Sequence, residues 1–143
     1  MISLVLEIPN ETHRLEYGRI MDRWEQLEDN IQPALMRRGN TPYERWLEYC
    51  EDDRKTGSML STHVPCTLYF ALNEQREIVG SIVLNHEDTE RGHLHVGIVP
   101  WHRGKGYGTA MLALVLKECL KKGIRKVIVV RTAKKTYLQY KPF

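Results

Sequence analysis

The chain has 143 residues, of which 42% are hydrophobic and 27% are charged. This length and composition fit one soluble domain over residues 1–143 and leave no room for two full-sized domains. The net charge of +3 is too small to indicate a nucleic-acid partner by itself. No stretch approaches the roughly 18 apolar residues that a membrane span requires, so we expect no membrane partner.

Three cysteines are spread widely along the chain, at Cys50, Cys66 and Cys119. Their odd number, and the absence of a CxxC motif or a Cys/His cluster, argue against a disulfide framework and a zinc site. We therefore expect reduced thiols, no bound metal and a cytoplasmic location. The apolar run at residues 1–8 has no preceding positive charges and no small-residue cleavage site, which favours a first strand over a signal peptide.

The first half of the chain predicts one short strand and two helices. Residues 3–8 have strand character, and Pro9 ends them. Asn10 can cap a helix whose apolar residues recur at roughly helical spacing, at Leu15, Ile20, Trp24, Leu27 and Ile31. The sequence Thr41-Pro42-Tyr43-Glu44 combines an N-cap, a proline at the first helical position and a capping-box glutamate, so a second helix is predicted from Thr41. Residues 56–66 have no periodicity, which is typical of a loop.

The second half of the chain predicts strands around one long helix. Residues 67–72 and 78–85 are β-rich runs that form a hairpin-like pair. A third strand, residues 93–99, would place His93, His95, Gly97 and Val99 on one face and Leu94, Val96 and Ile98 on the other. An amphipathic helix from about Thr109 to Gly123 precedes a buried-type strand at residues 126–131. Because strand, helix and strand form a βαβ unit, we expect residues 93–99 and 126–131 to pair in parallel.

A glycine-rich loop joins the third strand to the long helix, with the sequence Arg103-Gly104-Lys105-Gly106-Tyr107-Gly108-Thr109. Glycines permit positive φ and let a ligand approach the backbone, and the helix presents its free N–H groups and positive dipole end beside them. Arg103 and Lys105 add two full charges. The loop therefore predicts a site for a pyrophosphate or similar anion, although three glycines could also form only a tight turn. Neither the Walker nor the Rossmann spacing fits it.

Residues 92–130 resemble the central motif of the GNAT superfamily of N-acetyltransferases. In that motif a strand and a proline precede [Q/R]-x-x-G-x-[G/A], and a long helix and a further strand follow. Arg103, Gly106 and Gly108 occupy the signature positions, and the spacing from Pro100 also matches. The resemblance implies an α+β fold of three α/β/α layers with a mixed, mainly antiparallel sheet. It also implies an N-acetyltransferase that moves the acetyl group of acetyl-CoA to a primary amine, on a small molecule or on a protein.

The resemblance further implies which residues bind acetyl-CoA. The main chains of Ile98 and Val99 would pair with pantetheine, where the strand splays from its parallel neighbour. The loop residues would hold the pyrophosphate, namely Arg103, Gly104, Lys105, Gly106, Tyr107, Gly108 and Thr109. Lys105, Lys134 or Lys135 could reach the adenosine 3′-phosphate.

The catalytic residues do not follow from the resemblance. A carboxylate on a central strand often serves as the base in this superfamily, and neither residues 78–85 nor residues 93–99 contain one. His95 and Glu87 are our candidates, because a histidine titrates near neutral pH and either group could accept a proton from the amine. A lone histidine is also commonly structural. The alternatives close to these two are His86, Asp88 and His93.

The chain departs from the family's pattern after about residue 130. Its last segment has neither the Asn-rich turn nor the amphipathic helix of the family, which indicates a truncated or divergent C-terminal part. We expect an exposed sheet edge there and a homodimer that covers it. Two functions stay open, an active N-acetyltransferase and a degenerate module that binds acetyl-CoA with little or no activity. A nucleic-acid surface is disfavoured because aromatic residues are not interleaved with the late basic residues.

Overall fold

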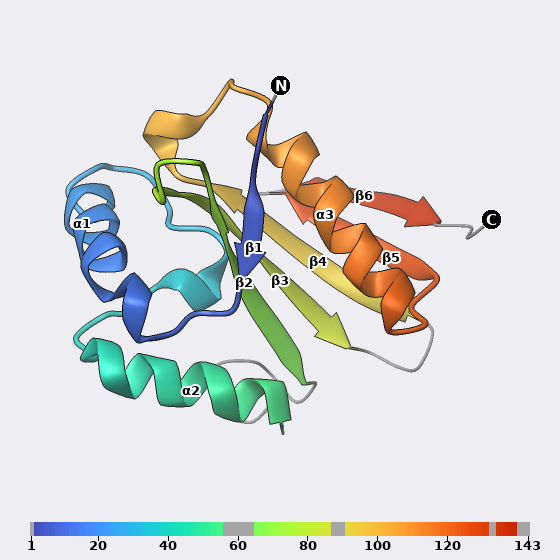
Figure 1. The fold of residues 1–143 in the computed structure, drawn as a ribbon, viewed down its shortest axis with the longest axis horizontal. Helices are drawn as coiled ribbons and strands as arrows, with labels where there is room; N and C mark the ends of the chain where they lie inside the picture. Colours follow the sequence, from blue (N-terminus) through green and yellow to red (C-terminus); the bar gives the residue numbers. More distant parts are fainter. Residues whose placement is uncertain (1, 56–64, 87–90, 132–133, 140–143) are drawn as a thin grey trace.

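A six-stranded sheet lies between two layers of helices, as Figure 1 shows. The structure is a computed structural model, and it describes residues 2–55, 65–86, 91–131 and 134–139. The strands lie in chain order, β1 Val5–Glu7, β2 Cys66–Leu72, β3 Ile78–His86, β4 Arg91–Ile98, β5 Lys126–Arg131 and β6 Lys134–Gln139. The helices are α1 Arg14–Trp24, α2 Tyr43–Lys55 and α3 Tyr107–Lys121, with the 3-10 turns η1 Glu11–His13, η2 Ala34–Met36 and η3 Pro100–His102.

The sheet is mixed because β4 and β5 run parallel while the other neighbouring strands of the described sheet are antiparallel. This confirms the predicted α+β fold with a mainly antiparallel sheet. The helix α3 connects β4 to β5, whose register runs from Arg91 opposite Lys126 to Val96 opposite Arg131. The predicted parallel βαβ unit is therefore confirmed. Gly123 ends α3 at a φ of +78°, with the Ile124 N–H donating to the Cys119 carbonyl at 2.9 Å.

Two apolar cores hold the layers together, one on each face of the sheet. On one face the aromatic rings of Tyr17 and Trp46 stack with centroids 4.6 Å apart, and Phe70 of β2 lies 5.9 Å from Trp46. On the other face α3 buries Met111, Val115 and Cys119, against a surface that includes Leu94 and Val96 of β4. The strand β4 has the two faces that the sequence predicts. Leu94, Val96 and Ile98 lie toward α3, and Val99 lies in the core formed with α1 and α2.

The first helix is shorter than the sequence predicts. Asn10 caps the turn η1 as expected, since its side chain accepts from the Thr12 N–H at 2.9 Å. However, α1 ends at Trp24, and the predicted apolar positions Leu15 and Leu27 are 86% and 43% exposed. The buried face is instead formed at i, i+3, i+4 and i+7, by Tyr17, Ile20, Met21 and Trp24. Beyond Trp24 the chain leaves the helix and crosses toward β4.

The second helix agrees with the sequence, whereas the predicted loop at residues 56–66 is described only at its end, where Cys66 begins β2. The helix α2 begins at Tyr43, two residues after the predicted start at Thr41. Trp46 and Cys50 form its buried face. Most of the predicted loop, residues 56–64, lies outside the described residues. No helix in the described part of the chain is long and apolar enough to cross a membrane.

The strand β6 was not predicted from the sequence. It pairs antiparallel with β5, from Lys126 opposite Gln139 to Arg131 opposite Lys134. Only residues 132–133 separate the two strands, so there is no room for a helix between them. The expected exposed edge is therefore not at β5, because β6 covers that edge and itself ends the sheet. The sequence KKTYLQ contains β-prone Thr and Tyr but lacks the alternation of apolar residues that would have identified a strand.

A charged cluster at Glu7 fastens the short edge strand β1. The Glu7 carboxylate accepts from Arg76 in the β2–β3 turn, with Nη1 and Nη2 at 2.6 and 2.8 Å. It also lies 2.8 Å from Nε2 of the buried His13, whose Nδ1 accepts from the Asn10 N–H. These bonds, led by those from Arg76, lower the pKa of Glu7 to about 2. Charge-assisted contacts therefore join β1, the start of α1 and the β2–β3 turn.

Replacing Glu7→Gln should lower the free energy of unfolding at pH 7 by about 1 to 2 kcal/mol. Because the folded-state pKa of Glu7 is about 2 and its ordinary value is 4.5, the stabilisation is complete above pH 4.5 and is lost as the pH falls through 2. Urea unfolding of both proteins between pH 6 and about pH 2 would measure this, and the variant should lose less stability across the acid range. Equal acid sensitivity of the two proteins would contradict the assignment.

Candidate functional site

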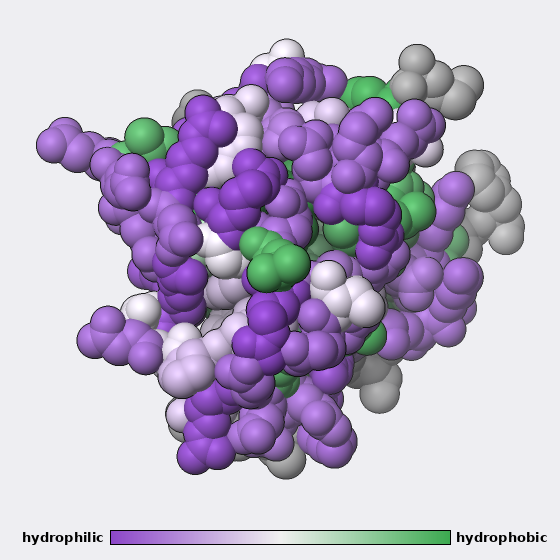
Figure 2. Space-filling view, turned by 60° about the vertical axis from the view of Figure 1, so that its left-hand side comes forward, coloured by the Kyte–Doolittle hydropathy of each residue, from purple (hydrophilic) through white to green (hydrophobic). Residues whose placement is uncertain are grey.

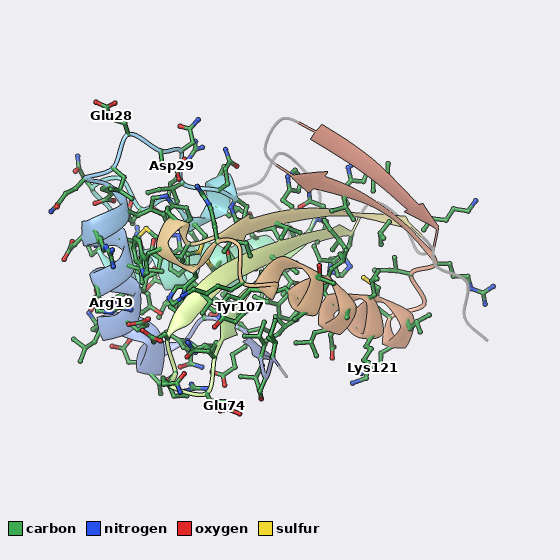
Figure 3. All side chains as sticks on the ribbon, turned by 90° about the horizontal axis from the view of Figure 1, so that it is seen from above. Arg19, Glu28, Asp29, Glu74, Tyr107 and Lys121 are labelled. Atoms are coloured by element: carbon green, nitrogen blue, oxygen red, sulfur yellow. The ribbon has the colours of Figure 1, made fainter. Side chains whose placement is uncertain are left out.

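The glycine loop forms an open main-chain cradle at the N-terminus of α3. Gly104 and Gly106 have φ values of +76° and +85°, which is the left-handed region that the sequence predicts for these glycines. Gly106 is the N-cap of α3, and no side chain caps that end of the helix. The first N–H groups of α3 therefore lack a side-chain acceptor within the loop, and they add to the positive end of the helix dipole. Tyr107, labelled in Figure 3, marks where the helix begins.

Arg103 directs its guanidinium away from this cradle. Its Nε donates to the Ile98 carbonyl at 3.3 Å, and its Nη2 donates to Oδ2 of Asp29 at 2.8 Å. The bond from Arg103 is the main reason that the pKa of Asp29 lies below its usual value. Lys105 and Thr109, by contrast, are exposed beside the cradle. Both cations predicted to face an anion are exposed, and Arg103 differs from Lys105 in that its side chain is held by Asp29 and Ile98.

The strand β4 extends past the end of β5. Their pairing stops at Val96 opposite Arg131, and β4 continues through Ile98. The Val99 N–H donates to the Val79 carbonyl of β3 at 2.9 Å, so that group is already used within the sheet. Since main-chain groups alternate in direction along a strand, the Ile98 groups point to the side on which β5 has ended. Of the two residues expected to pair with pantetheine, Ile98 thus has its main-chain groups on this side, where its carbonyl also accepts from Nε of Arg103.

His95 lies near this point on the face of the sheet that α1 and α2 cover. It is opposite Val83 of β3, which belongs to the core of that face, and opposite Val130 of β5. Its half-buried ring places Nε2 3.4 Å from Nδ2 of Asn85. An amide nitrogen only donates, so this contact suits a neutral imidazole whose Nε2 accepts from Asn85. Burial, with a smaller contribution from His93, lowers the pKa of His95.

The structure describes only some of the other candidate bases. Glu87 and Asp88 lie outside the described residues. His86 is at the end of β3, where burial lowers its pKa. Among the described residues, no group of three or more His, Cys, Asp or Glu side chains is arranged to hold a metal ion.

The structure adds neighbours of this region that were not identified from the sequence. A Cβ on Gly97 would lie only 1.8 Å from the carbonyl oxygen of Gln32, so the chain after α1 touches β4 main chain to main chain. Ser81 is opposite Gly97 on β3, and its buried Oγ has no hydrogen-bond partner in the part of the chain that the structure describes. Asp29 and Gln32 fell within or beside the predicted first helix, so no pattern in the sequence connected them with the glycine loop or β4.

Comparison with known proteins identifies one family. The sequence profile described as the acetyltransferase (GNAT) family matches residues 22–138, which is more than half of the chain. The match includes the glycine loop and continues past residue 130 to β6. No curated protein sequence matches the chain significantly.

Several solved structures share the fold at low sequence identity. A GNAT-family acetyltransferase from Staphylococcus aureus Mu50 has a TM-score of 0.56 and 18% identity, over 89% of this chain and 72% of that chain. A ribosomal-protein-alanine N-acetyltransferase from Brucella melitensis biovar Abortus has a TM-score of 0.57 and 14% identity, over 92% and 82%. A dodecameric spermidine N-acetyltransferase from Vibrio cholerae has a TM-score of 0.59 and 11% identity, over 88% and 68%. Identities this low show the fold alone.

The close approach at Gly97 predicts that Gly97→Ala destabilises the protein by roughly 1 to 3 kcal/mol, because the new methyl group must displace the main chain at Gln32. Gly18→Ala is the matched control, since nothing lies within 4 Å of a Cβ at that position of α1. Alanine there should stabilise the helix by about 0.5 to 1 kcal/mol. Urea unfolding measures both changes, and a Gly97→Ala variant as stable as the wild type would contradict the contact.

Proposed function

The chain belongs to the acetyltransferase (GNAT) family and is an acyltransferase, and on this premise we propose that it moves the acetyl group of acetyl-CoA directly to a primary amine. The glycine loop is the observation that carries the proposal. Its two left-handed glycines lead into an uncapped helix N-terminus at the end of a strand that extends past its parallel neighbour. Such an arrangement suits a ligand that combines a pyrophosphate with an amide-containing arm.

The main chain of the loop would hold the cofactor. N–H groups at the start of α3 would donate to the pyrophosphate of acetyl-CoA, across the stretch Gly104, Lys105, Gly106, Tyr107, Gly108 and Thr109. The exposed Lys105 would add a full positive charge, and the main chain of Ile98 would pair with the pantetheine arm. Acetyl-CoA supplies the activated acetyl group when bound. The protein then contributes mainly by holding the thioester and the amine together.

His95 would act as the general base. The amine nitrogen attacks the thioester carbonyl carbon, a C–N bond forms, and the C–S bond breaks to release the thiolate. The proton lost by the nitrogen goes to Nε2 of His95, once that atom releases the Asn85 N–H, while the thiolate takes a proton from solvent. A neutral ring with a lowered pKa is ready to accept a proton at pH 7, which supports this role. Transfer of that proton to solvent returns His95 to its starting state.

The acceptor is proposed only as a class, a primary amine on a small molecule or on a protein. Two structural neighbours are named as a ribosomal-protein-alanine N-acetyltransferase and a spermidine N-acetyltransferase. A peptide that begins with alanine and the polyamine spermidine are therefore the first acceptors to assay with this chain. Acetyl-CoA binding without transfer to either amine, or to a wider amine panel, would favour a degenerate binding module instead.

We further propose a single-domain, cytoplasmic homodimer. All described helices and strands pack on one sheet, which supports one domain over residues 1–143. Cys50, Cys66 and Cys119 are buried and are not joined in a disulfide, as is usual for thiols of a reducing compartment. The strand β6 ends the sheet, and an unpaired strand edge is a ready surface for a second copy. Light scattering at high protein concentration tests the dimer, which a clean monomer would exclude.

Acetyl-CoA should bind the wild type and bind at least tenfold more weakly to Gly106→Ala, since alanine disfavours a φ of +85° and would turn the loop's N–H groups away. Gly108→Ala is the matched control. It lies in the first turn of α3, a Cβ there comes no closer than 3.9 Å to Ile98, and the family's signature accepts alanine at that position. Calorimetric titration measures the affinities. Equal affinity of wild type and Gly106→Ala would rule out the cradle.

His95→Gln should lower kcat by about 10²- to 10⁴-fold while acetyl-CoA affinity is kept. In the wild type the rate should rise with pH through a pKa below the ordinary histidine value of 6.5, because the deprotonated ring is the active form. The variant should lack that rise. His86→Gln is the control, as that ring is also half-buried with a lowered pKa but lies at the end of β3. A pH profile of His95→Gln identical to the wild type would remove His95 from the mechanism.

A further inference from the structure

Arg103 has a different task from the one its place in the loop signature suggests. We propose that Arg103 is a positioning residue that fastens residues 25–33 to the glycine loop through Asp29, and that it does not bind the cofactor phosphates. This inference rests on the proposed function, since it concerns how the acetyl-CoA loop and the acceptor side of β4 are joined.

The first step is the direction of the side chain. Two nitrogens of the guanidinium are already engaged, Nε with the Ile98 carbonyl and Nη2 with Asp29. The two bonds use two of the five guanidinium N–H groups, and they fix the direction in which the remaining donors point. Figure 3 shows Asp29 on the connection that follows α1, well separated from Tyr107 at the start of α3. Arg103 therefore reaches toward α1 and not toward the N–H groups of the cradle.

The second step is that Asp29 is itself held in place. Its Oδ2 also accepts from Nε1 of Trp24 at 3.3 Å, and Trp24 is a core residue with 1% exposure. The carboxylate thus bridges the buried end of α1 and the first residue of the glycine loop. Arg103 and Asp29 are 46% and 37% exposed, so their ion pair contributes little to global stability. The effect of the ion pair is instead to fix the position of residues 25–33 relative to the glycine loop.

The third step is that the chain has further contacts on both sides of Asp29. Before it, the guanidinium of Arg23 in α1 lies 4.0 Å from the centre of the Trp101 ring in η3, within cation–π range. After it, the Gln32 carbonyl lies against Gly97 of β4. Residues 25–33 therefore contact the glycine loop through Asp29 and β4 through Gln32. They form a wall at Gly97, two residues along β4 from His95 and on the same face of the strand.

A conformational change in the glycine loop should consequently affect residues 25–33 through Arg103. The guanidinium holds Ile98 and Asp29 at once, and the Ile98 main chain is the proposed partner of pantetheine. Acetyl-CoA that orders Ile98 and the loop would also order residues 25–33 without touching them. Acetyl-CoA binding and the order of residues 25–33 would then be coupled through a chain of hydrogen-bonded groups. Local opening of residues 25–33, measured as main-chain hydrogen exchange, would report this coupling.

The test compares Arg103→Gln and Asp29→Asn, with Lys105→Gln as the control for a lost loop cation. Main-chain hydrogen exchange is followed for residues 25–33 with and without acetyl-CoA, and calorimetry gives the acetyl-CoA affinities. The first two variants should behave alike, with roughly tenfold faster exchange in residues 25–33 and affinities within about threefold of wild type. Acetyl-CoA should slow the exchange of this segment in wild type and Lys105→Gln but not in the other two.

Opposite behaviour of the two partners would overturn the proposal. If Arg103→Gln weakened acetyl-CoA binding tenfold or more while Asp29→Asn left it unchanged or stronger, Arg103 would be a phosphate ligand restrained by Asp29. Unchanged exchange of residues 25–33 in Asp29→Asn would also overturn it, because the fastening would then not exist. If wild type failed to bind acetyl-CoA, the proposed function would fail, and the exchange rates without ligand would still decide whether Arg103 and Asp29 hold the segment.

Discussion

The parallel pairing of β4 with β5 is the constraint on which the rest of this structure depends. Parallel neighbours cannot be joined by a tight turn, so a sheet that is otherwise antiparallel must contain one crossover, and α3 provides it. The crossover places a helix N-terminus directly after the end of β4. Because β4 continues past the last described pair with β5, that N-terminus lies near the main chain of Ile98, whose carbonyl accepts from Arg103.

Electrostatics at this junction come mainly from the backbone. The left-handed glycines and the uncapped start of α3 provide donors that need no side chain, and the helix dipole favours an anion there. The two cations nearby differ in what surrounds them. Both are exposed, but Arg103 forms an ion pair with Asp29 at 2.8 Å. Two charges that look equivalent in the sequence RGKG therefore have different surroundings in the tertiary structure.

The two faces of the sheet have separate tasks. Against one face α3 packs an apolar stripe whose main effect is to fix the direction of the helix and hence of the cradle. The other face carries the aromatic core of α1 and α2, and at its edge the chain after α1 settles on Gly97, two residues from His95. The glycine loop, His95 and residues 25–33 thus lie near the C-terminal end of β4. The distances between these three parts depend on their contacts with β4 rather than on the length of a loop.

The sequence by itself determined the βαβ unit, the glycine cradle and the paired strands β2 and β3, because periodicity, glycine chemistry and helix caps act between residues that are close in the chain. Only the tertiary structure decided where α1 ends, since Leu15 and Leu27 continue the helical spacing but lie off the buried face. It also decided that Arg103 pairs with Asp29, 74 residues away, and that Gln32 covers Gly97. Such contacts leave no periodic pattern in the sequence. The strand β6 likewise depends on an edge that exists only after β5 has joined the sheet.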